Sequence, residues 1–122
     1  MNVLKVTLPK DSQVFVLEDS PMRQAWFRKR IPRVTVVDSV QGMIAYFETK
    51  PICDYIFLDH DLGDGNGNGV EAARWLKQKF GVNVSALLIH SWNTVGVRNM
   101  QDVLPGAPAI PFGNFDLEVE KD

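Results

Sequence analysis

The sequence predicts an α/β protein in which a mostly parallel, five-stranded sheet carries helices on both faces. Three observations lead to this expectation. Extended and helical patterns alternate along the chain, three of the expected strands are continuous apolar runs, and polar residues follow directly after those runs. Alternation predicts parallel strands, because right-handed crossovers return each strand parallel to the previous one. Uninterrupted apolar runs are typical of strands that are buried on both faces.

The first half of the expected core contains two strand–helix pairs. QVFVLED (13–19) is the first strand, and the helix after it (20–31) begins with Ser20 as its N-cap and Pro21 in its first position. The β-branched run 34–39 is the second strand. The next helix has apolar residues at helical spacing, namely Val40, Ile44 and Phe47.

The second half of the expected core continues the alternation. YIFLD (55–59) is the third strand, and Asn68 with Glu71 forms a variant of the capping box at the start of the next helix. VSALLIHS (84–91) is the fourth strand. The remaining elements are a helix at 94–104 and a short fifth strand at 107–112, which must lie at an edge because prolines interrupt it.

At 122 residues the chain is expected to form one domain, 1–122, with its core in 13–112. Strands one, three and four are the most apolar, so we expect the order 2-1-3-4-5 with the third strand central. Residues 2–8 are a possible additional strand. Residues 113–122 are either an edge strand or a C-terminal tail.

Composition limits the classes of partner. The chain has 13 basic and 15 acidic residues, which argues against a double-stranded nucleic acid or a membrane as partner. The basic run 23–33 is either the solvated face of a helix or a face for a protein partner. Cys53 is the only cysteine, which excludes an internal disulfide and fits a reducing compartment. Because neither a membrane span nor a signal peptide is evident, we expect a cytoplasmic protein.

Acidic residues at the ends of two strands predict a metal site. Carboxyl ends of parallel strands meet at one edge of a sheet, where ligands bind. Asp19 and Asp59 are the expected direct ligands of Mg²⁺ or Mn²⁺, which prefer oxygen donors. Asp61 would add its carboxylate or its backbone carbonyl, and Glu18 would act through water. The alternative is that some of these acids cap helices or turns.

The two histidines of the chain also follow strands. Histidine exchanges protons near neutral pH, so His60 and His90 are candidates for the base and the acid of phosphodiester hydrolysis. A purely structural hydrogen-bonding role is the alternative. If the backbone turns at Asp59, all of Asp59, His60 and Asp61 can reach the edge of the sheet. If it stays extended through 61, His60 faces away from the two acids and orients its neighbours.

Residues after the fourth strand are candidates for substrate binding. Ser91 and Asn93 are able to bind phosphate or sugar, or to cap the next helix. Arg98 is able to bind phosphate, and Trp92 is able to stack on a base. The tract GDGNGNG (63–69) allows close approach of a phosphate, resembles a calcium loop without its last glutamate, or is simply flexible.

The acids and Ser91 resemble the acidic pocket of a response-regulator receiver domain. The lysine that receivers carry after their fifth strand is absent, and the residues after Phe112 leave no room for their final helix. The chain is more similar to the cyclic-phosphate processing receiver domains, over most of residues 14–104. The motifs that carry this resemblance are LDHDLG (58–63) and HSWN (90–93), followed by VGVRNM (95–100).

This resemblance implies a receiver-like, flavodoxin-like fold with a reduced or missing final helix, and a role in nucleotide signalling or in phage–host conflict. Three classes of function remain open. The first is a metal-dependent phosphodiesterase that processes a cyclic phosphate or cyclic nucleotide. The second is a phosphoacceptor receiver that uses Asp59. The third is a non-catalytic module that binds a nucleotide or a protein partner.

Overall fold

A four-stranded parallel sheet forms the centre of the protein in the computed structural model, which describes residues 3–121. Its strands are β2 (Val14–Leu17), β3 (Thr35–Val37), β4 (Tyr55–Leu58) and β5 (Leu87–Ile89). They lie in the order β3-β2-β4-β5, and every pairing is parallel. This is the predicted order 2-1-3-4, with the strand that precedes Asp59 in an inner position.

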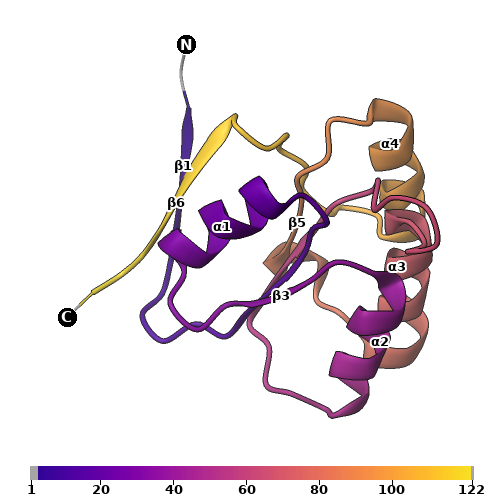
Figure 1. Cartoon of the computed structure of the whole chain (residues 1–122), viewed down its shortest axis with the longest axis horizontal. Helices are drawn as coiled ribbons and strands as arrows, with labels where there is room; N and C mark the ends of the chain where they lie inside the picture. Colours follow the sequence, from indigo (N-terminus) through magenta and orange to yellow (C-terminus); the bar gives the residue numbers. More distant parts are fainter. Residues whose placement is uncertain (1–2, 122) are drawn as a thin grey trace.

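Helices cover both faces of this sheet, as predicted. Figure 1 shows α2, α3 and α4 together on one side of the sheet and α1 on the other. The α1 helix starts as expected, because the Ser20 side chain accepts a hydrogen bond from the Arg23 amide and Pro21 occupies the first helical position. The helices are α1 (Pro21–Arg30), α2 (Val40–Glu48), α3 (Gly69–Trp75), which continues into the π-helical turn η1 (Leu76–Phe80), and α4 (Thr94–Val103).

The predicted fifth strand is reduced to a single bridge between Ile89 and Ala109. The segment 108–112 still runs beside β5, since the Ile110 amide donates to the Ile89 carbonyl and the Ile89 amide donates to the Pro108 carbonyl. The five-stranded prediction was therefore wrong by one strand. Pro108 and Pro111 have no amide hydrogen, so they cannot continue a regular ladder.

The two ends of the chain form a second, two-stranded sheet. β1 (Leu4–Leu8) pairs in parallel with β6 (Phe115–Val119), so residues 113–121 do not form a simple tail. The predicted strand at 2–8 is thus present from Leu4, while Asn2 and Asp122 lie outside the described residues. The register begins with Leu4 opposite Phe115.

The β1–β6 sheet completes one of the two cores. Phe27 and Ile31 from α1 pack with Phe57 of β4 and with Phe115 and Leu117 of β6. In the described part of the chain no helix follows α4, in agreement with the expectation of a reduced or missing final helix. The β1–β6 sheet packs beside α1 on that face in its place (Figure 1).

The larger core lies between the sheet and the other three helices. Residues of β2, β4 and β5 such as Leu17, Leu58 and Ile89 pack there against Met43 of α2 and Met100 of α4. All four residues of β2 are buried, which explains its continuous apolar sequence. None of the helices within 3–121 combines the length and apolar character that a membrane span requires.

Candidate functional site

Three polar side chains are brought together because each is the first residue after a strand. Leu17 is in register with Leu58, and Leu58 with Ile89, so the next residues of the three neighbouring strands lie side by side. Successive residues of an extended chain alternate between the faces of a sheet. Because Leu17, Leu58 and Ile89 face the larger core, the residues that follow them turn to the α1 side. These residues are Glu18, Asp59 and His90.

This trio is compact and buried. One potential ligand atom from each of Glu18, Asp59 and His90 lies within 4.8 Å of the others. His90 is 0% exposed, and its Nε2 lies 3.0 Å from Glu18 Oε1. Its ring packs against Phe27 of α1, with 5.3 Å between the ring centroids. Among the described residues, His90 Nδ1 is the buried side-chain nitrogen without a hydrogen-bond partner.

Burial and the neighbouring groups act differently on the two carboxylates of the trio. Burial raises the pKa of Asp59 to about 6, and Glu18 adds to this effect while His90 opposes it. Burial also tends to raise the pKa of Glu18. The hydrogen bonds that Glu18 accepts from His90 and from the Ser20 amide, together with the positive Arg23, outweigh burial and hold that pKa below its usual range.

A cavity of about 440 Å³ opens above this trio. Glu18 and Asp59 contribute to its wall, and neither histidine lines it. Asp19 belongs to the cavity wall and not to the trio. Burial and the nearby Glu18 raise the pKa of Asp19. The other lining residues are Ser20, Met22, Arg23, Asp61, Gly63, Ser91, Trp92 and Asn93.

The structure places Glu18 in the trio and Asp19 in the cavity wall, while their roles as metal ligands stay predictions. Asp19 was expected as a direct metal ligand and Glu18 as a ligand through water. The position of Glu18, directly after β2, places its carboxylate in the trio with Asp59. Asp19 is one residue further along the chain, where the backbone leaves β2 and approaches α1.

His60 faces away from Asp59, which answers the question of its orientation. Strand β4 ends at Leu58, and the chain bends at His60. The His60 ring lies against Gly96 of α4, where an added Cβ would come within 2.5 Å of the ring. Asp59 and Asp61, by contrast, both line the cavity. Asp59 and Asp61 thus share the cavity while the His60 ring lies toward α4, although the chain bends at His60.

His60 nevertheless contacts the site through Asp61. Its Nδ1 lies 2.8 Å from Asp61 Oδ1, and this contact, opposed by slight burial and supported by Asn93, keeps the pKa of Asp61 below its usual range. The Asn93 side chain donates to both Asp61 oxygens, at 3.2 and 3.3 Å. The same side chain caps α4 by accepting from the Gly96 amide. Asn93 thus caps α4, which is one of the two predicted alternatives, while its binding of phosphate or sugar stays a prediction.

Three of the four residues expected to bind substrate line the cavity, and Arg98 does not. Ser91 is buried in the cavity wall and accepts a hydrogen bond from the Asn93 amide. Trp92 is 56% exposed, and its Nε1 donates to the Phe112 carbonyl at 2.8 Å. Arg98 is exposed on α4 and does not line the cavity.

Arg23 is one of the cavity residues that the sequence did not single out. It lies in the first turn of α1, and its Nη1 is 3.8 Å from Glu18 Oε1. Its guanidinium carbon lies 4.9 Å from the centroid of the Phe112 ring. Among the residues that line the cavity, it is the single basic one. The sequence did contain a sign of this role. Arg23 is three residues after the N-cap Ser20, and the first turn of α1 comes directly after the acidic residues that follow β2.

The Gly/Asn tract is held by hydrogen bonds rather than left as a free loop. The Asn66 side chain donates to the Leu62 carbonyl, and the Asn66 carbonyl accepts from the Val40 amide. The Asn68 side chain caps α3, and the Asn68 backbone forms an isolated antiparallel β-bridge with Asp61. Gly63 and other glycines of the tract have positive φ, which permits this compact path.

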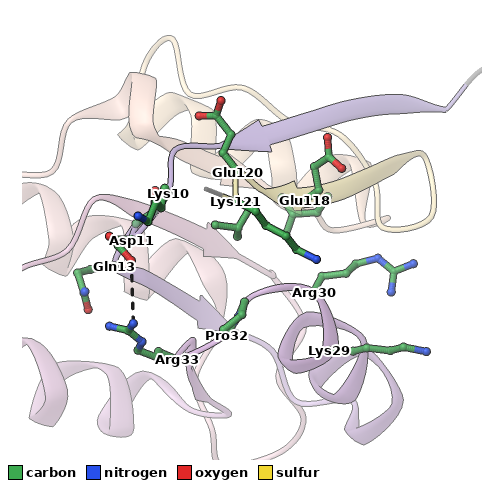
Figure 2. Close-up of a pocket in the computed structure, with 13 residues that line it drawn as sticks. Lys10, Asp11, Gln13, Lys29, Arg30, Pro32, Arg33, Glu118, Glu120 and Lys121 are labelled. Carbon is green, nitrogen blue, oxygen red and sulfur yellow. Dashed lines mark ion pairs between the residues drawn. The ribbon is translucent and has the colours of Figure 1, made fainter.

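A larger cavity of about 830 Å³ lies at the other end of α1, between the end of that helix and β6 (Figure 2). Arg33 pairs there with Asp11 at 4.0 Å. Its lining mixes basic residues such as Lys29 and Lys121 with acidic ones. It is separate from the trio, and a protein partner for the basic run 23–33 stays a prediction.

Comparison with known proteins agrees with this geometry. The model of the cyclic-phosphate processing Receiver domain family matches residues 14–105, which include all members of the trio. The chain belongs to this family. No curated protein matches the chain significantly.

Solved structures with the same fold include response regulators. The phosphorylated cyanobacterial phytochrome response regulator RcpA is 17% identical, with a TM-score of 0.68 over 82% of this chain and 79% of that protein. The Mn²⁺-bound response regulator Rcp1 is 15% identical, with a TM-score of 0.65 over 82% and 80%. A LuxR-family regulator from Aurantimonas is 22% identical, with a TM-score of 0.58 over 81% and 71%. These similarities show that the family member described here has a receiver fold.

Proposed function

We propose that this receiver-like protein hydrolyses a cyclic phosphodiester, such as a cyclic nucleotide, with the help of a divalent cation. The observation that carries the proposal is the trio of Glu18, Asp59 and His90 beside an open cavity, in a member of the cyclic-phosphate processing family. In the reaction, water adds to the phosphorus, one P–O ester bond breaks, and the leaving oxygen takes a proton. The product is a phosphomonoester with a free hydroxyl group.

The trio has the chemistry of a cation site. Two buried carboxylates beside each other repel unless a proton or a cation is shared. Oxygen ligands suit Mg²⁺ and Mn²⁺, and the imidazole of His90 favours Mn²⁺. Glu18, Asp59 and His90 are the residues that would hold the ion. A bound ion would neutralise charge on the phosphate and lower the pKa of a water molecule.

The remaining polar residues prepare the cavity for an anionic substrate. Ser91 and Asn93 present a hydroxyl and an amide in the wall. His60 acts through Asp61, because their contact fixes the carboxylate that faces the cavity. His90 holds Glu18 in the same way. His60 is therefore proposed as a positioning residue, and His90 as a ligand of the ion that also positions Glu18. Their predicted role in proton transfer is a hypothesis that the variants in the Discussion test.

Turnover of a panel of 2′,3′- and 3′,5′-cyclic mononucleotides with Mg²⁺ or Mn²⁺ tests the proposal. ³¹P NMR should show the cyclic phosphate signal converting to that of a phosphomonoester. Asp59→Asn should abolish this conversion, whereas Asp64→Asn, which changes an exposed carboxylate of the Gly/Asn tract, should not. Absence of turnover on the whole panel would reject the proposal. Labelling of Asp59 by acetyl phosphate in the same preparation would favour the phosphoacceptor function instead.

A further inference from the structure

The wall of the site cavity contains exposed apolar side chains beside its charged ones. Trp92 is 56% exposed and Met22 is 74% exposed, and both line the 440 Å³ cavity that contains Glu18 and Asp59. Large apolar side chains with this exposure are few among the described residues, so two at one cavity require an explanation. Apolar side chains beside a small number of charged groups are typical of a pocket for an amphipathic ligand.

The Trp92 ring is fixed in place although it is exposed. Its Nε1 donates to the Phe112 carbonyl, which ties the indole to the segment beside β5. Phe112 in turn contacts Trp26, with 5.0 Å between the ring centroids, and is thereby anchored to α1. A flat ring held in one orientation needs little further ordering when a second flat ring stacks on it. Met22 has an adaptable side chain that suits the same partner.

Arg23 supplies the positive charge at the same cavity. Its guanidinium lies 3.8 Å from Glu18 and rests over the Phe112 ring, and the side chain is 27% exposed. Guanidinium groups bind phosphate in a planar, two-pronged geometry. Phe112 therefore supports both Arg23, through its ring, and Trp92, through its carbonyl.

We infer that the cavity selects a nucleoside cyclic phosphate, whose base stacks on Trp92 beside Met22 while Arg23 binds the phosphate. This inference deepens the proposed function and rests on it for the identity of the reacting group. Base stacking on an aromatic side chain is sequence-tolerant, so the class of substrate is defined by the presence of a base.

Two ligands with the same five-membered cyclic phosphate separate the two contacts. Adenosine 2′,3′-cyclic monophosphate has a base, and glycerol 1,2-cyclic phosphate has none. Rapid mixing in the presence of Mg²⁺ reads binding from tryptophan fluorescence before turnover, with competition used for the base-free ligand. The nucleotide should quench the fluorescence of the wild type and bind at least about tenfold more tightly than the base-free compound.

The variants should respond to the two ligands differently. Trp92→Ala should weaken nucleotide binding, measured by calorimetry, by about tenfold to a hundredfold, Met22→Ala should weaken it less, and Trp92→Phe should restore most of it. None of these should alter binding of the base-free ligand. Arg23→Gln should weaken both ligands. Val95→Ala, an exposed apolar control, and Arg28→Gln, a basic control on α1, should change neither.

Equal affinity of the wild type for the two ligands would overturn the inference, as would binding of neither, or unchanged nucleotide binding in Trp92→Ala. A wild type that binds the nucleotide through Trp92 but never opens its ring would leave the inference standing and reject the proposed hydrolysis. A protein that opens both cyclic phosphates equally well, with no effect of Trp92→Ala, would support the proposed hydrolysis and overturn the inference about the base.

Discussion

The Asp59 carboxylate is fixed before any ligand arrives. Its Oδ1 accepts the His60 amide at 2.8 Å, and the residue is 5% exposed. Its position directly after β4 is maintained by the ladder, since the Asp59 amide donates to the Leu17 carbonyl. Asparagine has nearly the same shape as aspartate. The Asp59→Asn variant should therefore fold like the wild type and lose only the negative charge.

Asp59→Asn is expected to abolish Mn²⁺ binding, because it removes one of two anionic donors from the trio. Isothermal titration calorimetry with Mn²⁺ and Mg²⁺ measures this. Asp19→Asn should weaken binding only moderately, since Asp19 lies in the cavity wall and not in the trio. If Asp19→Asn lost binding and Asp59→Asn kept it, the original assignment of Asp19 would be right and the trio would not be the cation site.

His90→Ala and His60→Ala should differ in what they lose. His90→Ala should lose Mn²⁺ binding and turnover together, because His90 holds Glu18. His60→Ala should keep the metal and lose part of the turnover, because it acts through Asp61. Calorimetry and initial rates on the same preparations separate these effects. His90→Gln keeps a hydrogen-bond donor for Glu18 and serves if the alanine variant fails to fold.

Loss of turnover in His90→Ala by a hundredfold to ten-thousandfold with full Mn²⁺ binding would instead be the signature of a general acid or base. The positioning role would then be wrong. The same pattern in His60→Ala would mean that its ring reaches the substrate. Full turnover of the double variant His60→Ala/His90→Ala would remove both histidines from the chemistry.

At the scale of elements, α4 lies close to His60, which follows β4, because Gly96 has no side chain. An added Cβ at Gly96 would come within 2.5 Å of His60 Cγ and 2.6 Å of Cδ2. Gly96→Ala should therefore displace His60 or α4 and destabilise the protein by about 1–3 kcal/mol, as overpacking of a filled site does. Urea denaturation measures this change.

Val95→Ala is the matched control for this prediction, because Val95 is exposed in the same turn of α4. It should change the free energy of unfolding little. A Gly96→Ala variant as stable as wild type, with the His60–Asp61 contact intact by NMR, would show that the ring is not confined by α4.

Local patterns predicted most of these elements because local physics decides them. Ser20, Pro21 and Asn68 mark helix starts through hydrogen bonds and backbone angles within a few residues. The position of Asp59 follows from the length of an apolar run. The direction of His60 was left open because it depends on one bend in the chain. The role of Arg23 depends on the distance between α1 and Phe112, which no local pattern contains.

Contacts between distant segments were the least predictable. The pairing of β1 with β6 joins the two ends of the chain, and either strand alone has the pattern of a tail or an edge. Similarly, the trio joins residues from three strands whose register follows from the packing of the whole sheet. The sequence indicated which polar residues follow strands. The order and register of the strands determine which of these residues lie close together.

At the scale of the whole molecule, Asp116 ties the β1–β6 sheet to α1. Its Oδ1 accepts from Arg30 Nε at 2.9 Å and from the Leu117 amide at 2.8 Å. The hydrogen bond from Arg30 is the main cause that lowers the pKa of Asp116, and the Leu117 amide adds to it. A carboxylate with a lowered pKa in the folded state contributes stability that is present above its unfolded pKa of about 4 and is lost as the pH falls below it.

Asp116→Asn should therefore destabilise the protein at neutral pH, and the difference from wild type should shrink as the pH falls from about 5 to about 3. Urea denaturation across this range measures it. Asp64→Asn, in the exposed Gly/Asn tract, should show a smaller difference. A difference between Asp116→Asn and wild type that grows on acidification would contradict the assigned role of the ion pair.

The proline-broken segment beside β5 also bears on how copies of this protein behave in concentrated solution. The Ile110 amide points toward β5. Backbone groups alternate in direction along the segment, so those of Ala109 and Pro111 point away from β5. Pro111 has no hydrogen to donate, and an incoming strand would meet an incomplete row of donors, which is a common protection against aggregation. Pro111→Val should restore a donor and raise self-association, measured by light scattering, whereas Pro32→Val in the loop after α1 should not.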